Sequence, residues 1–238
     1  MRKRLLSAVS SVVFVVAAAS AARADTIVTY INPNTFGGND IVHWNSLGVN
    51  TTVPNNFTVI SDGGLSVMGI FEQGGSGSTT VECPPPISES CFAGNFSPGS
   101  VLLDTNSPGQ GPVDLAFNLP MGIYGVGFQI QSAAYGPFEA ELQAFDGATV
   151  LSTFFLTGNS NAEENNTAIF LGLKDLTGPN ITSIKYTTFN CSGPDCRSFY
   201  SNWLALQTTA TSSVPEPGTL MLLSSGLGIL GFLRRKLA

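Results

Sequence analysis

Short stretches in which apolar and polar residues alternate recur along most of the chain. The clearest is 138–144, where Phe, Ala, Leu and Ala alternate with Glu, Glu and Gln, so one face of a strand is buried and the other is wetted. Asp146-Gly147 then predicts a hairpin turn. Comparable stretches, rich in β-branched and aromatic residues and separated by Gly, Asn, Pro and Asp, predict strands at 26–31, 57–61, 65–71, 113–118, 124–131, 137–145, 149–156, 167–173, 181–189 and 203–207. No long window has a helical period, so the pattern predicts an all-β fold, a β-sandwich.

The alternation breaks down between 73 and 111. Gly, Ser and Thr dominate 73–80, and three prolines follow Cys83. We expect a long irregular surface region here, with one short strand near Val101.

The N-terminus has a different pattern, an apolar run preceded by cations. Arg2, Lys3 and Arg4 precede apolar residues at 5–19, and Ala-Arg-Ala at 22–24 has the small-x-small pattern of a cleavage site. This predicts a secretory signal peptide at 1–24. The folded body is then expected at 25–207, followed by a short polar linker at 208–213.

The C-terminus has an apolar run at 218–233 between a proline-rich segment and three cations. Pro215 and Pro217 fix φ and lack an amide hydrogen, so they hold Glu216 in an extended segment. The run predicts a single transmembrane helix of roughly 24 Å, with snorkelling cations covering part of the shortfall from a hydrocarbon core of about 30 Å. Because Lys and Arg clusters stay cytoplasmic, the C-terminus is predicted inside and the body outside. The residues of this signal are Val214, Pro215, Glu216, Pro217, Arg234, Arg235 and Lys236.

Together, the Val-Pro-Glu-Pro segment, the glycine-containing apolar run and the basic end resemble the PEP-CTERM sorting signal of Gram-negative bacteria. The resemblance implies processing by an exosortase, an integral membrane enzyme, and an association with exopolysaccharide and biofilm. More loosely, the runs 117–128 and 140–147 are similar to the jelly-roll ectodomains that often precede such tails. Two alternatives remain for the tail: an ordinary membrane anchor behind a proline linker, and a lipid-anchor signal, against which the terminal cations argue.

The charge of the predicted body differs from that of the whole chain. Residues 25–213 contain three cations (Lys174, Lys185, Arg197) against fifteen acids, a net charge of −12, whereas the whole chain has −6. Such a surface repels phosphate backbones, which excludes nucleic acid as a partner. The acids have two interpretations, solubility outside the cell and calcium binding, of which solubility is favoured.

Four cysteines remain in the predicted exported body. They allow three pairings, of which the local one, Cys83–Cys91 and Cys191–Cys196, is the simplest. A zinc site is the alternative, but exported thiols oxidise and neither spacing is that of a zinc knuckle. We therefore expect two disulfides and no metal or cofactor.

The sequence does not favour catalysis. His43, the only histidine, lies in an expected strand at 40–44 with no nucleophile motif. Glu139 and Glu141 would lie about 7 Å apart on one face of a strand, which suits an inverting glycosidase but also any wetted face. Glu163 and Glu164 lie in an Asn-rich loop and are expected to be solvated.

Two functions from different classes remain. The favoured one is a non-enzymatic protein, anchored in the inner membrane as a precursor and then released to the cell surface or extracellular matrix. The alternative is a carbohydrate-binding module acting on extracellular polysaccharide, with aromatic rings as stacking platforms. The candidate sugar contacts are Trp44, Tyr135, Tyr200 and Trp203.

Overall fold

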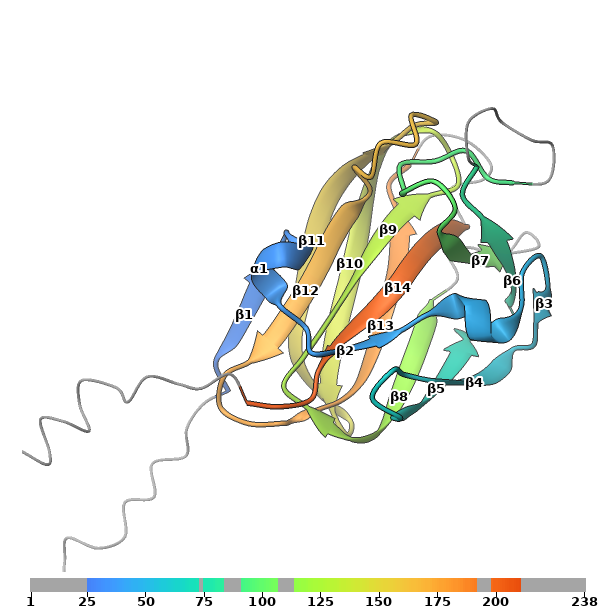
Figure 1. Ribbon diagram of the computed structural model, residues 1–238. Helices are drawn as coiled ribbons and strands as arrows, with labels where there is room; N and C mark the ends of the chain where they lie inside the picture. Colours follow the sequence, from blue (N-terminus) through green and yellow to red (C-terminus); the bar gives the residue numbers. More distant parts are fainter. Residues whose placement is uncertain (1–24, 73–74, 84–90, 107–113, 192–197, 211–238) are drawn as a thin grey trace, which may run out of the picture.

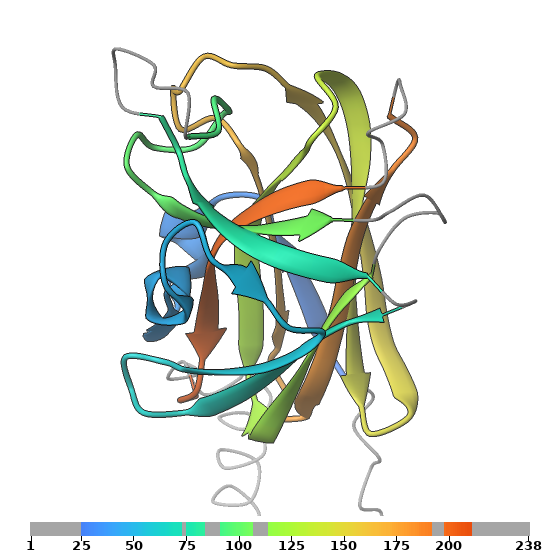
Figure 2. The same ribbon diagram turned by 90° about the vertical axis from the view of Figure 1, so that its right-hand side faces the viewer.

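The computed structural model describes residues 25–72, 75–83, 91–106, 114–191 and 198–210. These residues form two antiparallel sheets that pack face to face (Figures 1 and 2), which confirms the predicted all-β sandwich. The expected signal peptide (1–24) and transmembrane helix (218–233) lie outside the described residues.

Each sheet mixes strands that are distant in sequence. The eight-stranded sheet has the order β1 (Ile27–Tyr30), β12 (Ile169–Asp175), β9 (Gly125–Ser132), β14 (Phe199–Gln207), β7 (Val101–Asn106), β6 (Ser76–Val81), β3 (Thr52–Val53), and β2 (Asp40–Val42) also pairs with β14. The six-stranded sheet has the order β11 (Thr149–Ser160), β10 (Gly136–Asp146), β13 (Ile181–Phe189), β8 (Leu115–Ile123), β5 (Ser66–Phe71), β4 (Asn56–Ile60). Two single-turn helices complete the described elements, α1 (Pro33–Phe36) and the 3-10 helix η1 (Trp44–Leu47).

The core lies between the sheets and is rich in aromatic rings. Tyr186 is fully buried and stacks on Phe128 of the opposite sheet, with ring centroids 3.9 Å apart. Its hydroxyl forms a hydrogen bond of 3.1 Å with Ser201 Oγ, which satisfies the polar end of the ring in an otherwise apolar layer. The sheets are therefore held together by apolar burial, with few polar contacts across the interface.

The hairpin predicted at Asp146-Gly147 is confirmed. Strands β10 and β11 pair from Gly136↔Ser160 to Asp146↔Thr149, and Gly147 has a φ of +55°. A glycine reaches this left-handed conformation without the strain that a Cβ would add.

One prediction about the irregular region was wrong. Residues 73–80 were expected in a loop, yet β6 spans Ser76–Val81 and pairs with β7. A Cβ on Gly77 would lie 2.0 Å from the end of the Phe71 ring, so the missing side chain is what lets that ring pack against the strand. Gly77, part of the glycine-rich composition that indicated a loop, is therefore required by packing against Phe71.

The disulfide prediction is confirmed for one pair. Cys83 and Cys91 are bonded to each other. Cys191 is also disulfide-bonded, while Cys196, its predicted partner, lies outside the described residues.

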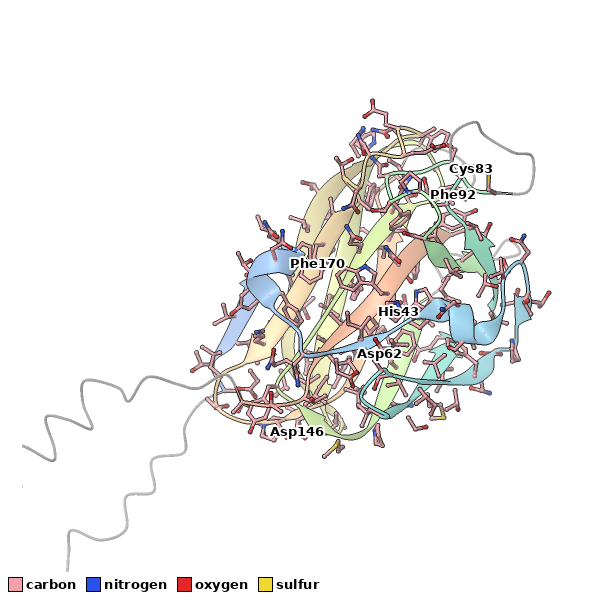
Figure 3. The ribbon with its side chains drawn as sticks, viewed as in Figure 1. His43, Asp62, Cys83, Phe92, Asp146 and Phe170 are labelled. Atoms are coloured by element: carbon pink, nitrogen blue, oxygen red, sulfur yellow. A yellow bond between two sulfur atoms is a disulfide. The ribbon has the colours of Figure 1, made fainter. Side chains whose placement is uncertain are left out.

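Both ends of the body lie at the same end of the sandwich (Figures 1 and 2). Tyr124 connects them, because its N–H donates to Gln207 O at 2.8 Å and its carbonyl accepts from Asp175 N at 2.7 Å. Leu176, which follows Asp175, donates its N–H to Thr26 O at 3.0 Å. Cys83 lies at the opposite end from the Asp146 hairpin turn (Figure 3), so the disulfide end of the sandwich points away from both termini.

Candidate functional site

The sorting-signal residues Val214, Pro215, Glu216, Pro217, Arg234, Arg235 and Lys236 lie outside the described residues. Within the part of the chain that the structure describes, no helix is long and apolar enough to span a membrane. The site that the structure does describe is a hollow on the outer face of the eight-stranded sheet.

This hollow forms around a β-bulge in β14. The pairing with β9 shifts between Ser201 and Leu204, so that Asn202 and Trp203 together lie opposite Gln129. Alternation resumes after the bulge, where Leu204 and Leu206 return to the core. The bulge thereby places an amide and an indole side by side on the outer face, which regular alternation could not do.

Trp44 stabilises the bulge from behind. Strand β7 pairs with β14 up to Ser201 and β2 pairs from Leu204, which leaves the carbonyls between them without a strand partner. Trp44 Nε1 donates to Ser201 O at 3.1 Å and to Asn202 O. The Trp44 side chain is only 1% exposed and stacks on Phe117, so no ring face remains for a sugar, and its role is to hold the bulge.

A row of amides forms the floor. Asn202 Nδ2 donates to Gln129 Oε1 at 3.3 Å, and Gln129 Nε2 donates to Asn166 Oδ1, also at 3.3 Å. Asn202 Oδ1 accepts from Trp203 N at 2.9 Å, which fixes the orientation of that amide. Asn202 and Gln129 are only 6% and 4% exposed, so these amides are held in place before any ligand arrives.

The wall nearest the chain termini is aromatic. Trp203 packs beside Phe170 with ring centroids 5.8 Å apart, and Phe36 of α1 lies against Phe170. Glycines make room for these rings, because a Cβ on Gly127 would lie 2.4 Å from Phe170 Cζ. Helix α1 begins at Pro33, and the preceding Asn32 accepts from the N–H of the second helical residue in an N-cap.

The opposite wall consists of two loops, 92–100 and 161–168. Asn95 joins them, since its Nδ2 donates to Asn161 Oδ1 at 3.0 Å and its Oδ1 accepts from Asn161 N at 2.7 Å. Its carbonyl also accepts from Ala168 N at 3.0 Å. One buried asparagine therefore fixes the relative position of both loops.

The hollow has two adjoining parts, of about 500 and about 480 Å³, which share Pro33, Asn34, Gln129 and Asn166. We call it the amide groove, and Figure 3 shows Phe170 and His43 on this face of the sheet. Among the described residues, neither part is lined by Asp, Glu, Lys or Arg. His43 Nε2 lies 3.4 Å from Asp62 Oδ2, and both side chains are largely exposed. The groove therefore presents amide groups and an aromatic edge, with no Asp, Glu, Lys or Arg among its described lining residues.

Of the four predicted sugar contacts, Trp203 is the one that lines the groove with an accessible side chain. Tyr135 is 53% exposed but lies outside the groove lining, and its hydroxyl donates to Ala93 O at 2.7 Å. Tyr200 stacks on Phe92 with centroids 3.6 Å apart, in the loop wall. Sequence reasoning missed Gln129, Asn166 and Asn202, and the only available signal was the polar Ser-Asn interruption before Trp203.

The remaining candidates are dispersed. Glu139 accepts from Asn190 Nδ2 and Glu141 from Gln143 Nε2, both on the six-stranded sheet and far from the amide groove. The strand predicted at 40–44 ends two residues earlier, at Val42, and His43 instead precedes η1.

Comparison with known proteins identifies the tail. A family model described as the PEP-CTERM protein-sorting motif matches residues 213–236. The motif implies export, a precursor anchored in the membrane at its C-terminus, and processing by an exosortase, which is a membrane enzyme. A search of curated proteins gave no match to the chain.

Proposed function

We propose that this is a non-catalytic protein of the cell surface or extracellular matrix, released from its membrane anchor by an exosortase and associated with exopolysaccharide. The observation that carries the proposal is the PEP-CTERM match at 213–236. The structure supports it in one respect: both ends of the body lie at one end of the sandwich, so the loop walls of the amide groove point away from the anchored terminus.

Strand order supports a jelly-roll ectodomain. Strands β7 to β14 are arranged as 7-14-9-12 in one sheet and 8-13-10-11 in the other, with every pair antiparallel. An eight-stranded double sheet with this connectivity is a jelly roll, to which β1 to β6 add edge strands and a strand beside β14.

Substitution in the tail tests the sorting proposal. We expect Glu216→Ala to leave export and folding intact, because residue 216 lies beyond the last strand. The protein should remain in the membrane fraction at its precursor size in a host with the matching exosortase. Glu163→Ala removes the same charge from an exposed loop residue and should be processed normally. Normal processing of Glu216→Ala would show that the tail is only an anchor.

A second candidate, carbohydrate binding, is favoured by the amide groove. The groove lining is uncharged among described residues although the body has a net charge of −12. Amides donate to and accept from hydroxyl groups, and a partly exposed indole supplies an apolar surface for a sugar ring. A groove of this composition suits a neutral polysaccharide, because it pays no desolvation of buried charge on binding.

Affinity electrophoresis in gels containing neutral or anionic polysaccharides tests this candidate. We expect retardation by a neutral glucan or galactan, and a loss of at least about tenfold in affinity for Trp203→Ala and Asn202→Ala. Phe155→Ala is the matched control, because Phe155 is an exposed aromatic on the six-stranded sheet. Retardation that depends on Phe155 or Tyr135 rather than Trp203 would place the sugar elsewhere. No retardation by any polysaccharide would remove this candidate without affecting the sorting proposal.

A further inference from the structure

Two carboxyl groups at the disulfide end, one fully buried and one partly exposed, each have a buried oxygen without a hydrogen-bond partner among the described residues. Glu82 follows β6 and is 0% exposed. Its Oε1 accepts from Gly94 N at 2.6 Å, but its Oε2 has no hydrogen-bond partner. Glu164, in the 161–168 loop, also has a buried oxygen, Oε1, without a partner. Two such oxygens in one region point to a partner beyond the described residues, because native structures leave few buried polar atoms unpaired.

Gly94 brings the two side chains into one neighbourhood. Its N–H donates to Glu82, and its carbonyl accepts from Glu164 N at 2.7 Å. Glu164 has a φ of +52°, an unusual conformation for a residue with a Cβ, so the loop holds it in place against local strain. Burial is the main cause that raises the pKa of Glu82 to about 7. The hydrogen bond from Gly94 opposes this rise, and the negative charge of Glu164 adds to it.

No cation among the described residues neutralises the pair. Lys174 lies over the Tyr30 and Phe36 rings, beside α1. Lys185 is bound to Glu72 and Asp114 on the six-stranded sheet. The Tyr135 hydroxyl donates to Ala93 O. Burial, and then the charge of Glu82, raise the pKa of Tyr135, so this side chain supplies no positive charge. The described residues therefore supply no positive charge to balance this pair if both carboxylates are ionised.

We propose that Glu82 and Glu164 provide the carboxylate oxygens of a divalent-cation site of the calcium class, formed by Glu82 Oε2 and Glu164 Oε1. Calcium prefers oxygen ligands and accepts irregular geometry, completing its shell with carbonyl oxygens and water. The described residues contain no group of three or more acidic, His or Cys side chains suited to a metal. Two carboxylates predict an affinity of roughly 0.1–1 mM, which is the range of extracellular modules.

The site has a structural consequence for the amide groove. Glu82 already holds the 92–100 loop through its backbone, since its N–H donates to Ser100 O at 2.8 Å and its carbonyl accepts from Gly99 N at 3.0 Å. Glu164 belongs to the loop that supplies Asn166 to the groove floor. A cation between them would link the 92–100 and 161–168 loops, which form one wall of the amide groove, in addition to the hydrogen bonds of Asn95.

Calcium titration of the full-length protein in detergent, after removal of metal with a chelator, tests the proposal. Calcium should raise the unfolding temperature of the wild type at neutral pH with a midpoint in the range above, and calorimetry should show one site. Glu82→Gln and Glu164→Gln should each abolish the shift. Glu163→Gln should keep it, because Glu163 is exposed and its carboxylate accepts a hydrogen bond from Asn165 Nδ2 at 2.7 Å.

Two outcomes would overturn the proposal. One is a calcium shift that survives Glu82→Gln or disappears in Glu163→Gln, which indicates diffuse binding to an acidic surface. The other is a wild type whose unfolding temperature does not change with calcium, combined with a Glu82→Gln variant that unfolds at a higher temperature than the wild type in the absence of calcium. That result would show that the pair holds a proton instead. Glu164 is partly exposed, so Glu164→Gln serves as the test if Glu82→Gln does not fold.

Discussion

The outer faces of the two sheets hold their polar side chains in different settings. On the eight-stranded sheet, helix α1 and two loops cover the face, and Gln129 and Asn202 are buried beneath them in fixed orientations. On the six-stranded sheet, Glu141 and Lys185 are only partly covered, and Lys185 forms ion pairs. Both faces derive from the same alternating strand pattern. Covering elements, together with the β14 bulge, therefore decide which face is hollowed and which remains a solvated surface.

The largest effect should come from breaking the covered face at Trp44. Trp44→Ala removes a fully buried ring and the indole donor that satisfies two carbonyls of the β14 bulge. We expect a loss of about 3–5 kcal/mol in the free energy of unfolding, measured with denaturant. Trp203→Ala, at the partly exposed neighbour, should cost roughly half of that or less. Equal losses at both positions would show that Trp44 does not support the bulge in particular.

A smaller, pH-dependent effect should come from Asp104, an acid of the covered sheet. Burial raises the pKa of Asp104 from 3.8 to about 6, partly opposed by the hydrogen bond from Ser78. The folded state therefore binds this proton more tightly than the unfolded chain, so stability is lost as pH rises from about 4 to about 6. Asp104→Asn should stabilise the protein by about 1–3 kcal/mol at neutral pH and change little near pH 4.

Thermal unfolding across this pH range measures the effect of Asp104→Asn. Glu163→Gln is its control, because it removes a carboxylate from an exposed loop position. A stabilisation by Asp104→Asn that is the same at both ends of the range would show that burial does not control this carboxyl.

The smallest effect is expected on the open face, at Lys185. Its Nζ lies 2.5 Å from Glu72 Oε2 and 3.6 Å from Asp114 Oδ2, with the Lys185 side chain 31% exposed. Lys185→Met should cost less than about 1 kcal/mol, and the cost should shrink as salt is added. Unfolding at low and high ionic strength measures it. A large, salt-independent loss would contradict the description of this face as solvated.

The sequence predicted the fold where local chemistry was sufficient. The 138–144 alternation and the Asp146-Gly147 turn specify β10 and β11 without reference to the rest of the chain. β6 was missed because its composition is typical of a loop. The reason for Gly77 lies in the Phe71 ring of β5, which the local sequence of β6 does not reveal. β14 was predicted only from 203 because the bulge at Asn202 interrupts its alternation, although the strand begins at Phe199.

The candidate site was less predictable for the same reason. Residue type alone selected Trp44 and Trp203 together, but one is buried under the bulge and the other lines the groove. Amides such as Gln129 and Asn166 are unremarkable in sequence, and only the pairing of β9 with β14 and the course of the 161–168 loop bring them together. The Glu82 and Glu164 pair likewise depends on Gly94, which is 12 residues from Glu82 but 70 residues from Glu164 in sequence.

The central place of β14 has a consequence for the order of events during export. This strand is the last that the structure describes, yet it pairs with β9, β7 and β2 in the middle of the eight-stranded sheet. A chain that crosses a membrane from its N-terminus delivers β14 last, so the sheet remains open until translocation is almost complete. Pro215 follows Gln207 by eight residues, which span at most about 28 Å. We therefore expect arrest of the tail in the membrane and closure of the sheet to be nearly simultaneous, so that the exosortase meets a body that has only just folded.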